Sequence, residues 1–186
     1  MGIKTGDNKE RKSKKYAKTP TIYQMEATEC GAASLSMIMG FYGRHVPLEK
    51  MRIETGVSRD GCNAKNILRA ARKYGFEAKG YRKSLNSLME VAPPCIIHWN
   101  FNHFVVYEGR KGNYFYINDP AMGRRKLTYE DLNDAFTGIV LTFQKTSEFK
   151  KEKRQRTLLG FIQNRLKGQF SAIMAMIAIG FLLVFP

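Results

Sequence analysis

The sequence predicts an α+β domain in which N-terminal helices pack on an antiparallel sheet. Helix-period apolar positions occupy the first half of the chain, and short runs rich in Ile, Val, Phe and Tyr occupy the second half. Helices followed by strands, without regular alternation, are typical of this class. The 186 residues are 44% hydrophobic, which is ordinary for a globular protein and excludes wholesale disorder.

Five helices are expected, and most carry a start or stop signal. Asn63, Ser84 and Thr128 are good N-caps because a short polar side chain accepts from the first free backbone N–H groups. Gly56 and Gly75 mark helix ends, where glycine tolerates the left-handed conformation. The expected helices cover residues 30–42, 47–55, 64–74, 84–90 and 129–136.

The expected strands are short and apolar, and turn residues such as Gly109, Gly112 and Asn113 separate some of them. This spacing predicts antiparallel neighbours joined by tight turns. The strands are expected at residues 76–82, 95–99, 104–108, 114–118 and 139–143.

The chain divides into four expected segments. A basic, disordered tail covers residues 1–18, the compact domain covers 19–145, and a basic, partly amphipathic linker covers 146–167. Residues 168–186 contain no charged side chain and predict the start of a truncated transmembrane helix, since a span needs about 20 apolar residues. A helix packed on the domain is the alternative for this last segment.

The net charge of +15 comes mostly from the two flanks of the domain. This distribution argues against a nucleic-acid partner, which requires a basic face on the folded body. It favours segments near an anionic membrane, and the Lys/Arg cluster before the apolar segment predicts a cytoplasmic domain attached to the membrane. A basic, membrane-tethered nucleic-acid binder remains an alternative.

Three cysteines at irregular spacing do not form a disulfide framework, which indicates a reducing compartment. The sequence has no CxxC pair and no GxxxxGK[ST] motif, so a zinc ribbon and a P-loop ATPase are both unlikely functions of this chain. We therefore expect no metal and no cofactor in the domain.

Cys30 is the candidate nucleophile. It begins an expected helix, where unpaired N–H groups and the helix dipole stabilise a thiolate, and Gly31, Ala32 and Ala33 leave room for a substrate backbone. A buried structural cysteine is the alternative, and it is the interpretation preferred for Cys62 and Cys95.

His103 is the candidate base, because a histidine where a strand begins can reach a helix N-terminus. Asp119 ends the next strand and is placed to orient that imidazole. The alternatives are a surface or core histidine whose hydrogen bonds only support the fold, and an Asp-Pro turn with a structural role. His98 and His45 are weaker candidates for the base. Gln24, six residues before Cys30, is a candidate oxyanion donor or else a solvated side chain.

Three segments together resemble the motifs of peptidase family C39, the papain-like domains of bacteriocin-exporting ABC transporters. Residues 24–37 (QMEATECGAASLSM) resemble its cysteine box, with Glu29 where many members have Asp. The other two boxes correspond to 102–106 (NHFVV) and to 118–121 (NDPA) with Arg124. Three short segments, TPT at 19–21, GVSRDG at 56–61 and WNFNHF at 99–104, are similar to one subgroup of this family. The substrates of that subgroup have leader peptides of the nitrile-hydratase or Nif11 type.

The resemblance implies a papain-like cysteine peptidase that removes a leader peptide after a Gly-Gly motif from ribosomal peptide precursors. It implies Cys30 as nucleophile, His103 as base and Asp119 as its orienting group, with Gln24 in the oxyanion hole. The implied partners are a precursor with an amphipathic helical leader and the remainder of an ABC transporter, whose ATP would bind a domain absent from this chain.

Substrate contacts are expected from residues beside the site and on the second expected helix. Trp99 and Phe101 are candidates for the cleft wall, and Met51, Ile53 and Val57 for a leader groove, with the core as the alternative. A docking domain without catalysis is the main alternative function, and the presence of Cys30 argues against it. A cell-wall amidase would require an extracellular domain, which the charge distribution disfavours.

Overall fold

The computed structural model describes residues 16–152, 174–176 and 179–180 of the chain. Residues 1–152 and 153–186 form separate compact units, and in the second unit the described residues are helical. The first unit contains, in chain order, the 3-10 turn η1 (Ala27–Glu29), α1 (Cys30–Phe41), α2 (Leu48–Thr55), α3 (Ala64–Lys73), β1 (Phe76–Arg82), α4 (Leu85–Met89), β2 (Cys95–Trp99), β3 (His103–Lys111), β4 (Tyr114–Asp119), β5 (Gly123–Leu127), α5 (Tyr129–Ala135) and β6 (Phe136–Lys145).

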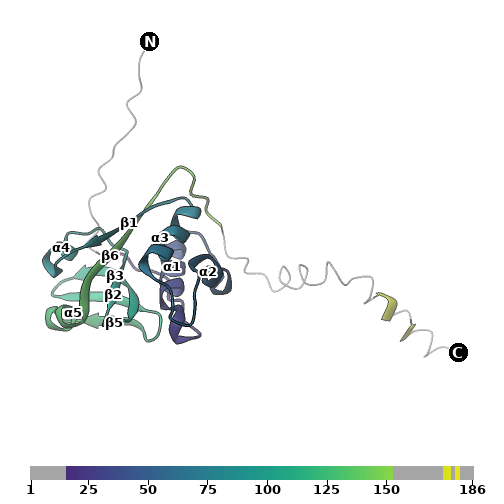
Figure 1. Ribbon diagram of the computed structural model, residues 1–186, viewed down its shortest axis with the longest axis horizontal. Coiled ribbons are helices and arrows are strands. Elements are labelled where there is room, and N and C mark those ends of the chain that lie inside the picture. Colours follow the sequence, from purple (N-terminus) through teal and green to yellow (C-terminus); the bar gives the residue numbers. More distant parts are fainter. Residues whose placement is uncertain (1–15, 153–173, 177–178, 181–186) are drawn as a thin grey trace, which may run out of the picture. The chain divides into compact units, whose positions relative to one another are not determined.

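The six strands form one antiparallel sheet in the order β1-β6-β2-β3-β4-β5. Figure 1 shows α1, α2 and α3 gathered on one side of this sheet, with α5 at the opposite side. The α+β class predicted from the sequence is therefore confirmed.

The helix boundaries follow the expected capping residues. The side chains of Asn63, Ser84 and Thr128 each accept from a backbone N–H in the first turn of α3, α4 and α5. Gly56 and Gly75 follow α2 and α3 with φ angles of 61° and 81°, which side chains with a Cβ rarely adopt.

The sheet is buried on both faces because successive side chains along a strand point in opposite directions. Ile96 of β2 and Val106 of β3 pack with α1, α2 and α3, whereas their neighbours Ile97 and Val105 pack with Leu88 and residues of α5. The helix α1 is itself buried over most of its length, so the N-terminus of α1 is held firmly against the sheet.

Two elements were not expected from the sequence. The edge strand β5 has the sequence GRRKL, and its charged side chains hide the apolar pattern that identifies a strand. The turn η1 is too short to give a periodic signal. β3 begins at His103 and β6 extends over residues 136–145, so both strands are longer than expected.

The ordered domain is also longer than the expected range of 19–145. The backbone N–H of Ala17 donates to the carbonyl of Glu108 at 2.7 Å, so residues 16–18 belong to the fold and not to a disordered tail. At the other end, the Phe149 ring packs against Phe76 with centroids 4.7 Å apart. This contact places the first residues of the expected linker in the domain.

The remaining expectations for the flanks, a disordered tail before residue 16, a basic linker after 152 and most of the apolar segment 168–186, lie outside the described residues. Within the described part of the chain, no helix is both long and apolar enough to cross a membrane.

A buried carboxylate fastens the N-terminal segment to the sheet. Glu108 in β3 accepts from the backbone N–H and the hydroxyl of Thr19, at 2.6 and 2.7 Å, and from Nε of Arg124 in β5 at 2.7 Å. Burial alone would raise the pKa of Glu108, but these donors hold it below its usual value. One ionised group therefore connects β3 to β5, across β4, and holds the N-terminal segment at Thr19.

We expect Arg124→Met to lower the free energy of unfolding by about 3 kcal/mol, because it leaves the buried Glu108 without its cation. Urea denaturation followed by the fluorescence of Trp99 measures this change. Lys111→Met, at an exposed position of β3, is the control and should change stability by less than about 0.5 kcal/mol. Equal stability of the two variants would contradict a supporting role for the ion pair.

Candidate active site

Cys30 is the first residue of α1 and follows the turn η1 directly. Its side chain is buried, with a relative exposure of 6%. One turn later, the Ser34 hydroxyl donates to the carbonyl of Phe104 at 3.0 Å. This bond joins α1 to β3 at the residue next to His103. It therefore fixes the position of the candidate nucleophile relative to the candidate base.

His103 and Asp119 meet at the same end of the sheet. β3 begins with His103, β4 ends with Asp119, and the two strands run antiparallel as neighbours. The distance from His103 Nε2 to Asp119 Oδ1 is 2.8 Å. The same carboxylate oxygen accepts from the backbone N–H of Ala121 at 2.8 Å, which fixes its direction through the Asp-Pro turn.

The His103 ring is close enough to the Cys30 sulfur for the two groups to interact. Because Nε2 faces Asp119, Nδ1 is the nitrogen left for the sulfur. Burial alone would lower the pKa of His103, but the hydrogen bond to Asp119, the interaction with the Cys30 sulfur and the negative charges of both groups outweigh it and raise the pKa to about 9. An imidazolium that persists near pH 7 is the partner that a thiolate requires.

The pKa of Asp119 is displaced in the opposite direction. Burial would raise it, but the bonds from His103 and from the backbone amides of Ala121 and Met122 hold it below its usual value. Asp119 is therefore ionised when His103 is protonated, and the pair can stabilise a positive imidazole next to the sulfur.

Gln24 is carried to the site by the N-terminal segment. Its backbone N–H donates to the carbonyl of Pro120, directly after Asp119, at 3.0 Å. The side-chain oxygen of Gln24 is buried and has no hydrogen-bond partner among the described residues. This oxygen can only accept hydrogen bonds, so it is not evidence for an oxyanion hole; that role would fall to the side-chain N–H groups of Gln24 and stays a prediction.

The other two cysteines have structural positions. The Cys62 sulfur packs closely against Gly31 in the first turn of α1, so it covers the N-terminus of this helix from a neighbouring loop. Burial, and then the proximity of Cys30, raise the pKa of Cys62 to about 11. Cys95 is fully buried in β2, and burial raises the pKa of its thiol as well.

His98, a weaker candidate for the base, forms its contact outside the candidate active site. Nδ1 of His98 lies 2.9 Å from the hydroxyl of Thr137 in β6, and burial and then His103 lower the pKa of His98. Within the described residues, no group of three or more His, Cys, Asp and Glu side chains is arranged to hold a metal ion.

The expected substrate-binding residues divide into exposed and buried ones. Phe101 is 83% exposed on the turn between β2 and β3, and Ile53 of α2 is 81% exposed. Met51 is fully buried and Trp99 is 5% exposed, so their burial favours the core alternative over a leader groove at Met51 and over a cleft wall at Trp99. Val57 is partly buried against the same core as Met51.

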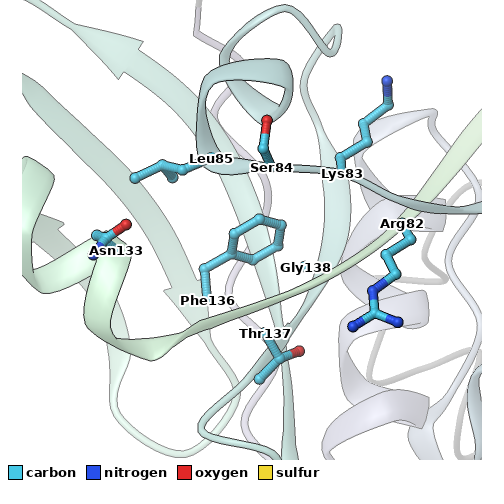
Figure 2. A pocket seen from close by; sticks show the side chains of 8 residues that line it. All are labelled: Arg82, Lys83, Ser84, Leu85, Asn133, Phe136, Thr137 and Gly138. Atoms are coloured by element: carbon cyan, nitrogen blue, oxygen red, sulfur yellow. The ribbon is translucent and has the colours of Figure 1, made fainter.

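One cavity lies away from these residues, between β1, α4 and the start of β6. Figure 2 shows the Phe136 ring at its centre, and its volume is about 410 Å³. It contains none of the candidate catalytic residues, so it does not belong to the site. Its lining consists of Arg82, Lys83, Ser84, Leu85, Asn133, Phe136, Thr137 and Gly138.

Sequence reasoning missed the hydrogen bond of Ser34 and the packing of Cys62 against Gly31. Ser34 follows Cys30 by one helical turn, and that spacing is a signal for a residue on the same face. No sequence signal joins Cys62 to Gly31, because the contact depends on the path of the loop after α2.

Comparisons with known proteins agree with this geometry. Residues 18–148 match the Peptidase C39 family. The chain is 38% identical over 138 residues to a probable microcin-H47 secretion/processing ATP-binding protein of Escherichia coli, and 36% identical over 138 residues to the colicin V secretion/processing ATP-binding protein of the same species. Each match covers 74% of this chain but 20% of the relative, so the chain spans about a fifth of their length.

A solved structure of a double glycine motif protease from an AMS/PCAT transporter, in complex with the leader peptide, is 58% identical. It matches with a TM-score of 0.69 over 70% of this chain and 94% of that chain. The peptidase domain of Streptococcus ComA, 23% identical with a TM-score of 0.65 over 70% of this chain and 100% of that chain, shows the same fold. The papain-like fold expected from the sequence is thereby confirmed.

The close packing at Gly31 generates a prediction. A methyl group there would lie 2.4 Å from Cys62 Sγ and 2.8 Å from Ile67 Cδ1. We expect Gly31→Ala to lower the free energy of unfolding by about 1–3 kcal/mol, because the side chains of Cys62 and Ile67 must move away from the new methyl group.

The double variant Gly31→Ala/Cys62→Ala tests this cause. Removing the sulfur relieves one of the two clashes, so the double variant should lose less stability in urea denaturation than the sum of the single variants. Strict additivity would show that Cys62 does not constrain this residue.

Proposed function

Because the chain belongs to the peptidase C39 family, we propose that it is a cysteine endopeptidase that cleaves a leader peptide after a Gly-Gly motif. The observation that carries the proposal is the chain of contacts from Asp119 through His103 to Cys30. The position of Cys30 at the start of α1 adds the positive end of a helix dipole to the imidazolium. Both stabilise the thiolate that attacks a carbonyl group.

The proposed reaction has two stages. The Cys30 thiolate attacks the scissile carbonyl, and the oxyanion that forms is stabilised by the Gln24 amide and the backbone N–H of Cys30. The imidazolium of His103 then gives its proton to the leaving amine, and the leader remains as a thioester. Water, deprotonated by the neutral His103, hydrolyses the thioester and restores the thiolate.

The substrate class is supported by the relatives. The similar solved structure is described as a double glycine motif protease with its leader peptide, and the relatives from Escherichia coli are described as secretion/processing proteins. We infer that the substrate is a precursor peptide with an amphipathic helical leader, of the nitrile-hydratase or Nif11 type, and that exposed Phe101 and Ile53 contact it.

The cellular setting is part of the same proposal. We infer that the domain acts in the cytoplasm, attached to the membrane through the apolar segment 168–186, as part of an ABC transporter that exports the product. ATP would bind to a nucleotide-binding domain outside this chain, and the proposed cleavage needs no metal and no nucleic acid.

The direct test incubates the full 186-residue chain with a synthetic Gly-Gly leader peptide and analyses the products by mass spectrometry. We expect cleavage after the second glycine and its complete loss in Cys30→Ala, because the nucleophile is removed. Cys95→Ala is the control for an unrelated thiol and should keep the activity.

Leader binding by both the wild type and Cys30→Ala, measured by fluorescence anisotropy, separates catalysis from docking. Binding without cleavage by the wild type would favour a docking domain. Full cleavage by Cys30→Ala would eliminate the proposed nucleophile.

The raised pKa of His103 predicts the alkaline limit of activity. Cleavage should fall as the pH rises through about 9, where the imidazolium loses the proton that the leaving amine needs. Asp119→Asn removes the negative charge that favours this proton, so the alkaline limb of kcat/KM should move to lower pH.

The profile is measured from pH 5 to 10 with the same peptide. Asp131→Asn, at the start of the distant helix α5, is the matched control and should leave the limb in place. An alkaline limb that stays in place in Asp119→Asn would refute the assigned role of that carboxylate.

A further inference from the structure

A second buried carboxylate, which the proposed reaction does not use, lies next to the nucleophile. Glu29 precedes Cys30, and its side chain is completely buried. One of its oxygens, Oε2, accepts from the backbone N–H of Met25 at 2.7 Å and of Glu26 at 3.1 Å. The carboxylate therefore closes the turn that follows Gln24.

The other oxygen of Glu29 faces a cation from a different element. Nε of Arg52, in the middle of α2, lies 2.9 Å from Glu29 Oε1, and its Nη2 lies 3.7 Å from Glu26 Oε1. Among the described residues, Arg52 is the one cation that pairs with Glu29. The guanidinium thus joins α2 to both ends of the turn between Gln24 and Cys30.

The charges around the sulfur show why this contact matters. The ionisable groups that interact with Cys30 are His103 from β3, with Asp119 of β4 behind it, and Cys62 from the loop before α3. Glu29, which is paired with Arg52 of α2, is the residue that directly precedes Cys30 in the chain. An unpaired Glu29 would oppose a thiolate on the adjacent residue, because like charges at short range disfavour each other. Arg52 supplies the compensating charge.

We propose that Glu29 and Arg52 are positioning residues that hold the Gln24 turn beside the nucleophile and neutralise the charge next to the thiolate. The inference rests on the proposed function, since it assigns these residues to the proposed reaction. Neither residue touches the substrate, and both act through Gln24 and Cys30. A salt bridge that only stabilises the fold would contribute to unfolding measurements but would not change the ionisation of Cys30.

The experiment separates these roles by titrating the thiol directly. The rate of Cys30 alkylation by iodoacetamide is measured against pH in the full chain, with the modified residue identified by peptide mapping. In Arg52→Ala we expect the midpoint of this titration to rise by about one pH unit, because the Glu29 carboxylate is no longer compensated. In Arg52→Ala/Glu29→Gln the midpoint should return toward the wild-type value, since both charges are gone.

Peptide cleavage gives the second readout. We expect kcat/KM for the Gly-Gly leader peptide to fall about 10- to 100-fold in Glu29→Ala, because the backbone N–H groups of Met25 and Glu26 lose their acceptor, and in Arg52→Ala. Arg52→Lys keeps the charge and should keep a wild-type titration midpoint. Glu54→Gln is the matched control, since Glu54 lies on α2 like Arg52 but pairs with Lys73 of α3.

A midpoint in Arg52→Ala equal to that of wild type would overturn the charge compensation, and unchanged kcat/KM in Glu29→Ala would overturn the anchoring of Gln24. Both results are distinct from failure of the proposed function, which appears as no cleavage by the wild-type chain. The alkylation titration needs no substrate and therefore reports on the pair in either case.

Discussion

The fold brings a helix N-terminus to the end of the sheet where β3 begins and β4 ends. In two antiparallel neighbours, the first residue of one strand and the last residue of the other lie at the same edge, which places His103 and Asp119 2.8 Å apart. The bond from Ser34 to Phe104 fixes α1 to this edge. The contact of Cys30 with His103 depends on both constraints, because neither the helix nor the strands alone would bring sulfur and imidazole together.

The N-terminal segment is the third support of the site. Its start is held at Thr19 by Glu108 and Arg124, and its end is held by Glu29. Between these anchors the Gln24 backbone bonds to Pro120. The segment that carries the oxyanion donor is thus fixed at three points, and each fixed point belongs to an element that also positions Cys30, His103 or Asp119.

The positions of Cys30, His103 and Asp119 were predictable because each residue stands where an element begins or ends. Capping residues and strand periodicity locate such boundaries well. The exposure of individual side chains was less predictable. Met51 and Ile53 lie two residues apart on α2, yet one is fully buried and the other is 81% exposed, and this depends on how the helix is rotated against α1.

Long-range polar contacts could not be predicted from the sequence, because sequence periodicity indicates only where apolar side chains are buried. In the sequence, Glu29 is only a charge-conserving replacement for Asp beside the nucleophile. Its burial depends on the ion pair with Arg52 of α2, which the sequence does not reveal. The edge strand β5 was missed because arginine and lysine occupy most of its positions. One of these residues, Arg124, is fixed by its hydrogen bond to Glu108. Sequence periodicity reports apolar burial, whereas these residues are fixed by charge.

Among the described residues, three carboxylates are buried, and each is paired with a cation. Glu108 is compensated by Arg124, Asp119 by His103, and Glu29 by Arg52. Burying an unpaired carboxylate is costly, so each of these cations is required by the fold itself. The His103 imidazolium differs from the two guanidiniums because it also contacts the thiol and can give up its proton. Guanidiniums maintain fixed charges around the site, and the single titratable cation is placed where the proposed reaction moves a proton.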